Sequence, residues 1–183
     1  MNARSSRYPS AVIALHWLTL ALLVAVYCLI EFRGIFPKDS VGRDAMKHWH
    51  FMLGLTVFCV VWLRLALRAT FHAPAITPPP PAWQMLAARA MHVALYVFLI
   101  VMPVLGWSTL SAKGGKIPFF GLELPPLLAA DKALGKRLEG IHETVGIIGL
   151  ALIGLHAAAA LFHHYLMRDD TLRRMGLRKP RRD

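Results

Sequence analysis

Four separate stretches of this sequence are each long and apolar enough to cross a lipid bilayer. They cover residues 10–30, 50–67, 91–110 and 145–162, and each holds about 18 to 21 residues, the length a helix needs to span a hydrocarbon core of about 30 Å. Lipid offers the backbone no hydrogen-bond partners, so such runs fold as helices. We therefore predict an all-α membrane protein. It is a single domain over residues 1–183, built as a bundle of four transmembrane helices whose last helix covers residues 142–162.

The charged residues predict the orientation of this bundle. Of the 21 Lys and Arg residues, twelve fall in segments that are cytoplasmic if both termini are cytoplasmic, and only three acids share those segments. These twelve are Arg4, Arg7, Arg64, Arg68, Arg89, Arg168, Arg173, Arg174, Arg178, Lys179, Arg181 and Arg182. The nine outer cations face seven acids. Because cytoplasmic segments carry the excess of cations, we predict an N-in, C-in topology. The basic cytoplasmic tail, residues 168–183, is expected to contact anionic lipids rather than nucleic acid.

The connecting segments differ in character. The proline run Pro78 to Pro81 in the inner linker predicts a stiff extended spacer, and Pro103 is expected to kink the third helix. Before the fourth span, apolar residues recur at helical intervals among lysines between Leu127 and Ile141. This pattern predicts a short amphipathic helix, which either lies at the outer surface or leads directly into the fourth helix.

Histidines at membrane depth are the strongest functional signal. A polar ring in hydrocarbon is costly, so an imidazole there needs a partner or a function. His142 and His156 are 14 positions apart, which places them on one face of a helix and about 21 Å apart along its axis. One helix thus offers a possible ligand near each membrane surface.

Depth along the helices matches these two histidines with two others. His16 lies at the level of His156 near the inner surface, and His50 lies at the level of His142 near the outer surface. Two such pairs on antiparallel helices are what two stacked metal centres require. The expected metal ligands are therefore His16, His50, His142 and His156.

Several neighbours bear on this assignment. His48 competes with His50 for the role of metal ligand on the second helix. Two residues that are two positions apart point to opposite sides of a helix, so only one of them can face inward. We choose His50, because Gly54 lies on the same helix face. His92 lies near the inner pair and remains a rival. Gly146 and Gly149 either leave room for a flat macrocycle or serve close helix packing.

Arg64 lies 14 residues beyond His50 on the same helix face, at the inner end. Its guanidinium either binds a haem propionate or reaches toward lipid headgroups. Cys28 and Cys59 are too few for an iron–sulfur cluster, and the chain lacks a C-x-x-C-H motif for covalent haem.

Three segments, "YPSAVIALHWLTLALLVAVYCLIEFRGIFP", "HFMLGLTVFCVVWLRLALR" and "HETVGIIGLALIGLHAAAALFHHY", resemble the bacterial cytochrome b561 family of small di-haem cytochromes. The resemblance covers almost the whole chain. It implies a multi-pass protein of the bacterial inner membrane with two non-covalent haem b groups. His16 and His156 would hold the inner haem, and His50 and His142 the outer one. His92 also resembles a family feature that is not assigned as a ligand.

Two histidines on each iron fill both axial positions, which favours electron transfer over oxygen activation. Free-standing members of the family resemble superoxide oxidases, so we expect an oxidoreductase that passes electrons from periplasmic superoxide to ubiquinone. Lys113 and Lys116 are the candidate residues for attracting the superoxide anion.

Two other functions remain open. The chain could be a cytochrome b anchor subunit that relays electrons between a partner dehydrogenase or hydrogenase and quinone, although a protein partner is not required. It could also be a haem-free transporter or assembly factor in which histidines relay protons.

Overall fold

The computed structural model of this protein describes residues 7–71 and 73–176. Four long helices dominate it: α1 (Ser10–Glu31), α2 (Val41–Thr70), α3 (Ala82–Ala112) and α4 (Lys132–Tyr165). All four are long and apolar enough to cross a membrane. The predicted four-helix membrane bundle is thus confirmed. His72 and residues 177–183, which are the last seven residues of the predicted basic tail, lie outside the described residues, as does Arg4.

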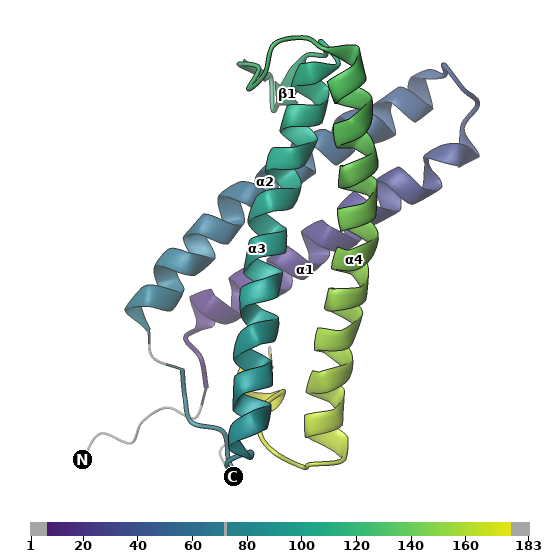
Figure 1. The fold of residues 1–183 in the computed structure, drawn as a ribbon. Helices are drawn as coiled ribbons and strands as arrows, with labels where there is room; N and C mark the ends of the chain where they lie inside the picture. Colours follow the sequence, from purple (N-terminus) through teal and green to yellow (C-terminus); the bar gives the residue numbers. More distant parts are fainter. Residues whose placement is uncertain (1–6, 72, 177–183) are drawn as a thin grey trace.

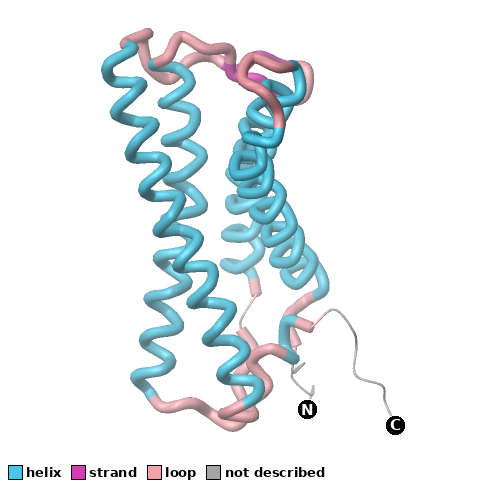
Figure 2. Tube along the Cα trace, turned by 90° about the vertical axis from the view of Figure 1, so that its right-hand side faces the viewer, coloured by secondary structure: helices cyan, strands magenta, loops and turns pink. Residues whose placement is uncertain are grey.

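The helices form two antiparallel pairs, α1 with α2 and α3 with α4. Figure 1 shows the first pair crossing behind the second at an incline, and the side view of Figure 2 separates the two pairs clearly. Val57 and Val61 of α2 pack against Phe98 and Leu99 of α3 to form the buried centre of the bundle. The core therefore lies where the two pairs meet.

Three helices start earlier than their apolar runs predict. The side chain of Ser40 caps α2 by accepting a hydrogen bond from the Arg43 amide, and Asp131 caps α4 by accepting one from the Leu134 amide. α3 begins directly after Pro81. The predicted starts near residues 50, 91 and 142 are therefore wrong by about nine or ten residues. Hydropathy locates the part of a helix in lipid, whereas capping residues decide where the helix begins.

The amphipathic segment before the fourth span is not a separate surface helix. α4 runs without interruption from Lys132 to Tyr165, so that segment forms its first turns. Of the two predicted arrangements, the helix that leads directly into the fourth span is the one observed. Likewise Pro103 lies inside α3, which continues past it as one helix.

Two short strands, β1 (Ile117–Phe119) and β2 (Leu122–Leu124), form an antiparallel β-hairpin between α3 and α4 that the sequence reading missed. Phe120 and Gly121 at its turn both have positive φ. The strands (magenta in Figure 2) lie at one end of the bundle, over both helix pairs. We call this the hairpin end. A 3-10 helix, η1 (Phe32–Ile35), follows α1 at the same end.

Residues 166–176, which we call the strap, cross the opposite end of the bundle. They include the 3-10 helix η2 (Arg173–Met175) and bring Arg174 to the amide of Tyr8 at the start of α1. Figure 1 shows the strap in yellow, running from the end of α4 back beneath the helices. We call this the strap end; it corresponds to the side predicted to be cytoplasmic.

Close packing of α3 on α4 depends on small residues. A side chain added at Gly149 would collide with the ring of Phe98, and one added at Gly146 would meet Met102 at 3.1 Å. Both glycines are buried. Of the two interpretations of these glycines, close helix packing is the one that the structure supports.

Candidate haem sites

Two histidine pairs lie at opposite ends of the bundle. At the strap end, the ring centroids of His16 (α1) and His156 (α4) are 6.3 Å apart. At the hairpin end, those of His50 (α2) and His142 (α4) are 6.2 Å apart. Each pair joins one helix of the first helix pair to α4. The structure therefore brings together the four residues that were matched by depth alone.

These separations fit a shared metal ion. A metal–nitrogen bond of about 2 Å on each side, plus about 1.1 Å from each nitrogen to its ring centre, places two imidazole centroids about 6.2 Å apart. No group of three or more His, Cys, Asp or Glu side chains suited to a metal ion occurs within residues 7–71 and 73–176. Pairs of imidazoles suit a haem, because the porphyrin supplies the other four ligands of the iron.

His50 is held in a tautomer suited to ligation. Its Nδ1 lies 3.0 Å from the carbonyl oxygen of Val26. Because a carbonyl only accepts hydrogen bonds, Nδ1 carries the proton and Nε2 keeps a free lone pair. Metal-binding histidines commonly donate their second nitrogen to a backbone carbonyl in this way, which fixes the ring and raises its basicity.

His142 lies against α3 at a position that only a small residue allows. A side chain added at Gly106 would come 3.1 Å from Cε1 of His142. Among the described residues, Nδ1 of His142 is one of the few buried side-chain atoms that lack a hydrogen-bond partner. Nothing lies within 4 Å of a side chain added at Gly54, one turn from His50. Open space beside Gly54 and the ring of His142 are therefore found together at the hairpin end.

The strap-end pair is more crowded. Nη2 of Arg64 lies 3.2 Å from Nδ1 of His16, and the ring centroid of His92 lies 5.5 Å from that of His156. The Arg64 guanidinium also lies 5.8 Å from the centroid of the Tyr96 ring. Three imidazoles and one cation thus share this end. His156 therefore has two imidazole neighbours, His16 at 6.3 Å and His92 at 5.5 Å between ring centroids.

His48 points to a different place from His50. It is exposed and lines a pocket of about 500 Å³ between the first turns of α2 and the β-hairpin. Lys47, Phe51 and Lys116 also line this pocket, and the Phe51 ring packs edge-on against His50 at 6.0 Å. The Phe51 ring therefore contacts both this pocket and the ring of His50.

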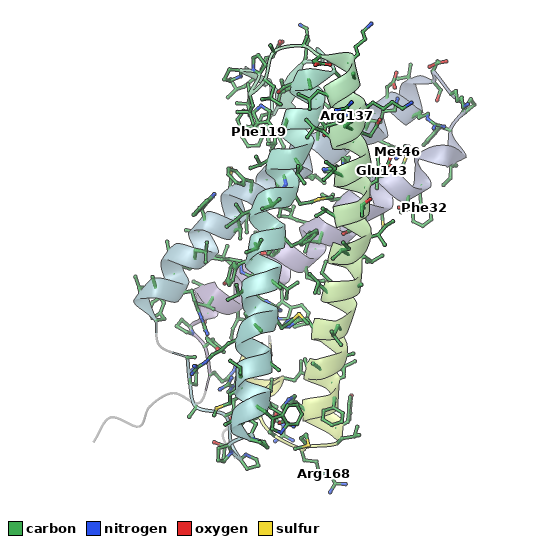
Figure 3. All side chains as sticks on the ribbon, in the orientation of Figure 1. Phe32, Met46, Phe119, Arg137, Glu143 and Arg168 are labelled. Atoms are coloured by element: carbon green, nitrogen blue, oxygen red, sulfur yellow. The ribbon has the colours of Figure 1, made fainter. Side chains whose placement is uncertain are left out.

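The two lysines expected to attract superoxide both form ion pairs. Lys113 pairs with Glu139 of α4, and Lys116 pairs with Glu123 of β2 at 3.1 Å. Of these two, only Lys116 lines the pocket. Each pairing reduces the positive field of its lysine, but exposed ion pairs are weak and easily exchanged. Figure 3 shows a further cation of this end, Arg137, on the first turns of α4, and Arg168 beyond the opposite end of the same helix.

Comparison with known proteins gives one consistent family. The model of the prokaryotic cytochrome b561 family matches residues 7–177. Cytochrome b561 homolog 1 of Escherichia coli is 39% identical over 95% of this chain and 99% of its own length. The probable superoxide oxidase CybB of Yersinia pestis is 32% identical over 94% of this chain and 97% of its own length. Cytochrome b561 homolog 2 of Escherichia coli is 29% identical over 92% of this chain and 90% of its own length.

Four membrane-spanning helices and paired histidines at both ends agree with these matches. The chain belongs to the prokaryotic cytochrome b561 family, whose members are multi-pass inner-membrane cytochromes that bind haem b and transfer electrons.

Proposed function

We propose that the protein holds two haem b groups, one between His16 and His156 and the other between His50 and His142. The observation that carries this proposal is the occurrence of two imidazole pairs at metal-bridging separations of 6.3 and 6.2 Å. A bis-histidine haem supplies a one-electron carrier with no open coordination site. The two pairs are 14 residues apart on α4, or about 21 Å along the helix axis, so the protein carries electrons from one membrane surface to the other.

Arg64 has a further part in this proposal. A guanidinium only donates hydrogen bonds, so its contact with His16 requires that Nδ1 of His16 be unprotonated. Ligation through Nε2 requires the opposite tautomer. Arg64 would therefore have to release His16 for that histidine to hold the iron, and its guanidinium could then pair with a haem propionate.

The proposed electron donor is superoxide, and its entry point is the pocket between α2 and the β-hairpin. Lys47, His48 and Lys116 line it, and the two lysines pair with Asp44 and Glu123 of the same pocket. The Phe51 ring lines the pocket and also packs against His50. The support from comparison is the relative named as a probable superoxide oxidase. Two superoxide anions lose one electron each to give two dioxygen molecules. The two electrons, with two protons, reduce one ubiquinone to ubiquinol.

This direction of flow agrees with an N-in, C-in topology. The strap end is then cytoplasmic, and the hairpin end, with its pocket, faces the periplasm where superoxide is oxidised. Arg68, Arg89 and Arg173 are exposed at the strap end, where anionic headgroups are within reach.

The decisive experiment combines haem stoichiometry with reduction by superoxide. The purified protein should contain two haem b per chain, and superoxide should reduce both, followed by electron transfer to added ubiquinone-1. Lys116→Gln should slow the superoxide step and weaken its dependence on ionic strength, because it removes one attracting charge. Lys132→Gln, which changes an exposed lysine outside the pocket, is the matched control.

The result also separates this function from the anchor-subunit alternative. Two haems that superoxide does not reduce, together with co-purification of a stoichiometric dehydrogenase or hydrogenase, would support the anchor. A preparation with fewer than two haems after haem-replete expression would contradict the di-haem proposal itself.

A further inference from the structure

The strap begins with a turn that is fixed firmly to α4. Arg168 adopts a positive φ of 55°, which reverses the chain after Tyr165. The buried carboxylate of Asp169 then accepts a hydrogen bond from the Thr171 amide at 2.9 Å and lies 2.6 Å from Nδ1 of His163. Burial alone would raise the pKa of Asp169, but these hydrogen bonds outweigh it and hold the pKa below its usual value. The carboxylate is therefore charged and bound at neutral pH.

The strap is next joined to the linker between α2 and α3. The amide of Asp170 donates to the carbonyl of Thr77 at 3.1 Å, and its carboxylate accepts from the Thr77 amide at 3.0 Å. Arg174 donates to the carbonyl of Pro74. Two separate parts of the strap thus hold this linker.

Arg174 also binds the start of α1. Its side chain is only 8% exposed, and its guanidinium lies 5.6 Å from the centroid of the Tyr8 ring. Arg68, in the last turn of α2, lies 5.4 Å from the same ring and donates to the Tyr8 hydroxyl at 3.0 Å. Tyr8 is therefore contacted by two cations, one from the first helix pair and one from the strap. Each cation–π contact contributes about 0.5–2 kcal/mol, more where water is excluded.

The last contact of the strap lies beside the proposed ligand on α1. The indole of Trp17 donates to the carbonyl of Met175 at 2.9 Å, and the same indole packs edge-on against His16 at 5.6 Å. At the other end of the strap, His163 follows His156 by seven residues, or about two turns of α4. The strap therefore connects the end of α4, about two turns beyond His156, to the residue of α1 that packs against His16.

We propose that the strap sets the separation of His16 and His156, with Arg174 as its main positioning residue. This inference rests on the proposed function, because it assumes that these two histidines hold the strap-end haem. Toward the hairpin end, the Tyr27 hydroxyl of α1 donates to the Gly146 carbonyl of α4 at 2.6 Å. This second contact joins α1 to α4 and does not involve α2, which carries His50, so only the strap-end pair has a direct tie between its two helices among the described contacts.

The test compares Arg174→Ala with Arg173→Ala. Both variants remove one arginine from the same 3-10 helix, but Arg173 is exposed. The spectral and potentiometric components of the two haems are first assigned with His156→Ala and His50→Ala. Arg174→Ala is expected to accelerate loss of the strap-end haem about tenfold, or to shift its low-spin electron paramagnetic resonance signal. In Arg174→Ala, the hairpin-end haem should behave as in the wild type. In Arg173→Ala, both haems should behave as in the wild type.

A second, milder variant keeps the test informative if Arg174→Ala does not assemble. Trp17→Phe removes the hydrogen bond to Met175 and retains an aromatic ring beside His16, so it should shift the strap-end signal alone. Wild-type signals and haem retention in both variants would overturn the inference, and so would equal loss of both haems. A wild-type protein with fewer than two haems, by contrast, would remove the proposed function first.

Discussion

The two histidine pairs have nearly equal ring separations but different surroundings. At the hairpin end, His50 donates to a backbone carbonyl. At the strap end, His16 accepts from the cation Arg64, and a third imidazole, His92, lies next to His156. A nearby cation favours the reduced iron, whereas a histidine that donates to a carbonyl is a stronger electron donor and favours the oxidised iron. We therefore expect the strap-end haem to have the higher reduction potential, which drives electrons from the hairpin end to the strap end.

The largest expected effect is the loss of a whole haem. His50→Ala should remove the hairpin-end haem and His156→Ala the strap-end haem, each leaving one haem per chain by pyridine haemochrome assay. His92→Ala should keep both. If His92→Ala lost a haem and His16→Ala did not, the strap-end pair would instead be His92 and His156.

The next effect is on the packing between the two sites. Gly149 lies seven residues from both His142 and His156, and a methyl group there collides with Phe98. Gly149→Ala should lower stability by about 1–3 kcal/mol, as overpacked cores do, measured as thermal release of haem. Gly154→Ala is the control, since nothing lies within 4 Å of the added carbon. Equal stability of the two variants would show that this contact relaxes freely.

Arg64 tests the difference in potential directly. Arg64→Gln should lower the potential of the strap-end haem by about 40–90 mV, which is about 1–2 kcal/mol for one electron. The hairpin-end potential should stay within error of the wild type. Arg89→Gln, an exposed cation on α3, provides the control. A shift of the same size in both haems would mean that Arg64 acts through overall charge rather than through its position.

The smallest effect concerns the pH dependence of the strap end. The pKa of Asp169 lies below its usual value, so its contribution to stability is complete above about pH 4 and is lost as the pH falls through the folded-state pKa. Asp169→Asn should destabilise the neutral protein by about 1 kcal/mol and flatten this acid dependence of haem release. An unchanged pH profile in the variant would assign the dependence to another group.

Much of the fold could be predicted from local patterns. Hydropathy locates all four spans, because a lipid core imposes both a length and a composition on any helix that crosses it. Helix starts were missed by nine or ten residues because the capping residues Ser40 and Asp131 lie outside the apolar runs. They could have been found from the preference of Ser and Asp for N-caps. The β-hairpin was missed because strands of three residues carry almost no periodic signal.

The candidate site was predicted to a similar degree. The depth of each histidine along its helix matched His16 with His156 and His50 with His142, and the structure places these rings 6.3 and 6.2 Å apart. The pocket that includes His48 and Lys116, and the strap contacts of Tyr8, Trp17 and Arg174, had no sequence signal. The strap contacts of Tyr8 and Trp17 join residues more than 150 positions apart.

The sequence by itself determined the four spans and the levels of the histidines, since both follow from the rise and rotation of a single helix in a slab of fixed thickness. Only the tertiary structure decided which neighbours surround each pair. The packing of separate helices brings a carbonyl to His50, a cation to His16 and the strap across one end of the bundle. Helix packing in lipid is set by local fits between side chains from distant parts of the chain, which no single stretch of sequence contains.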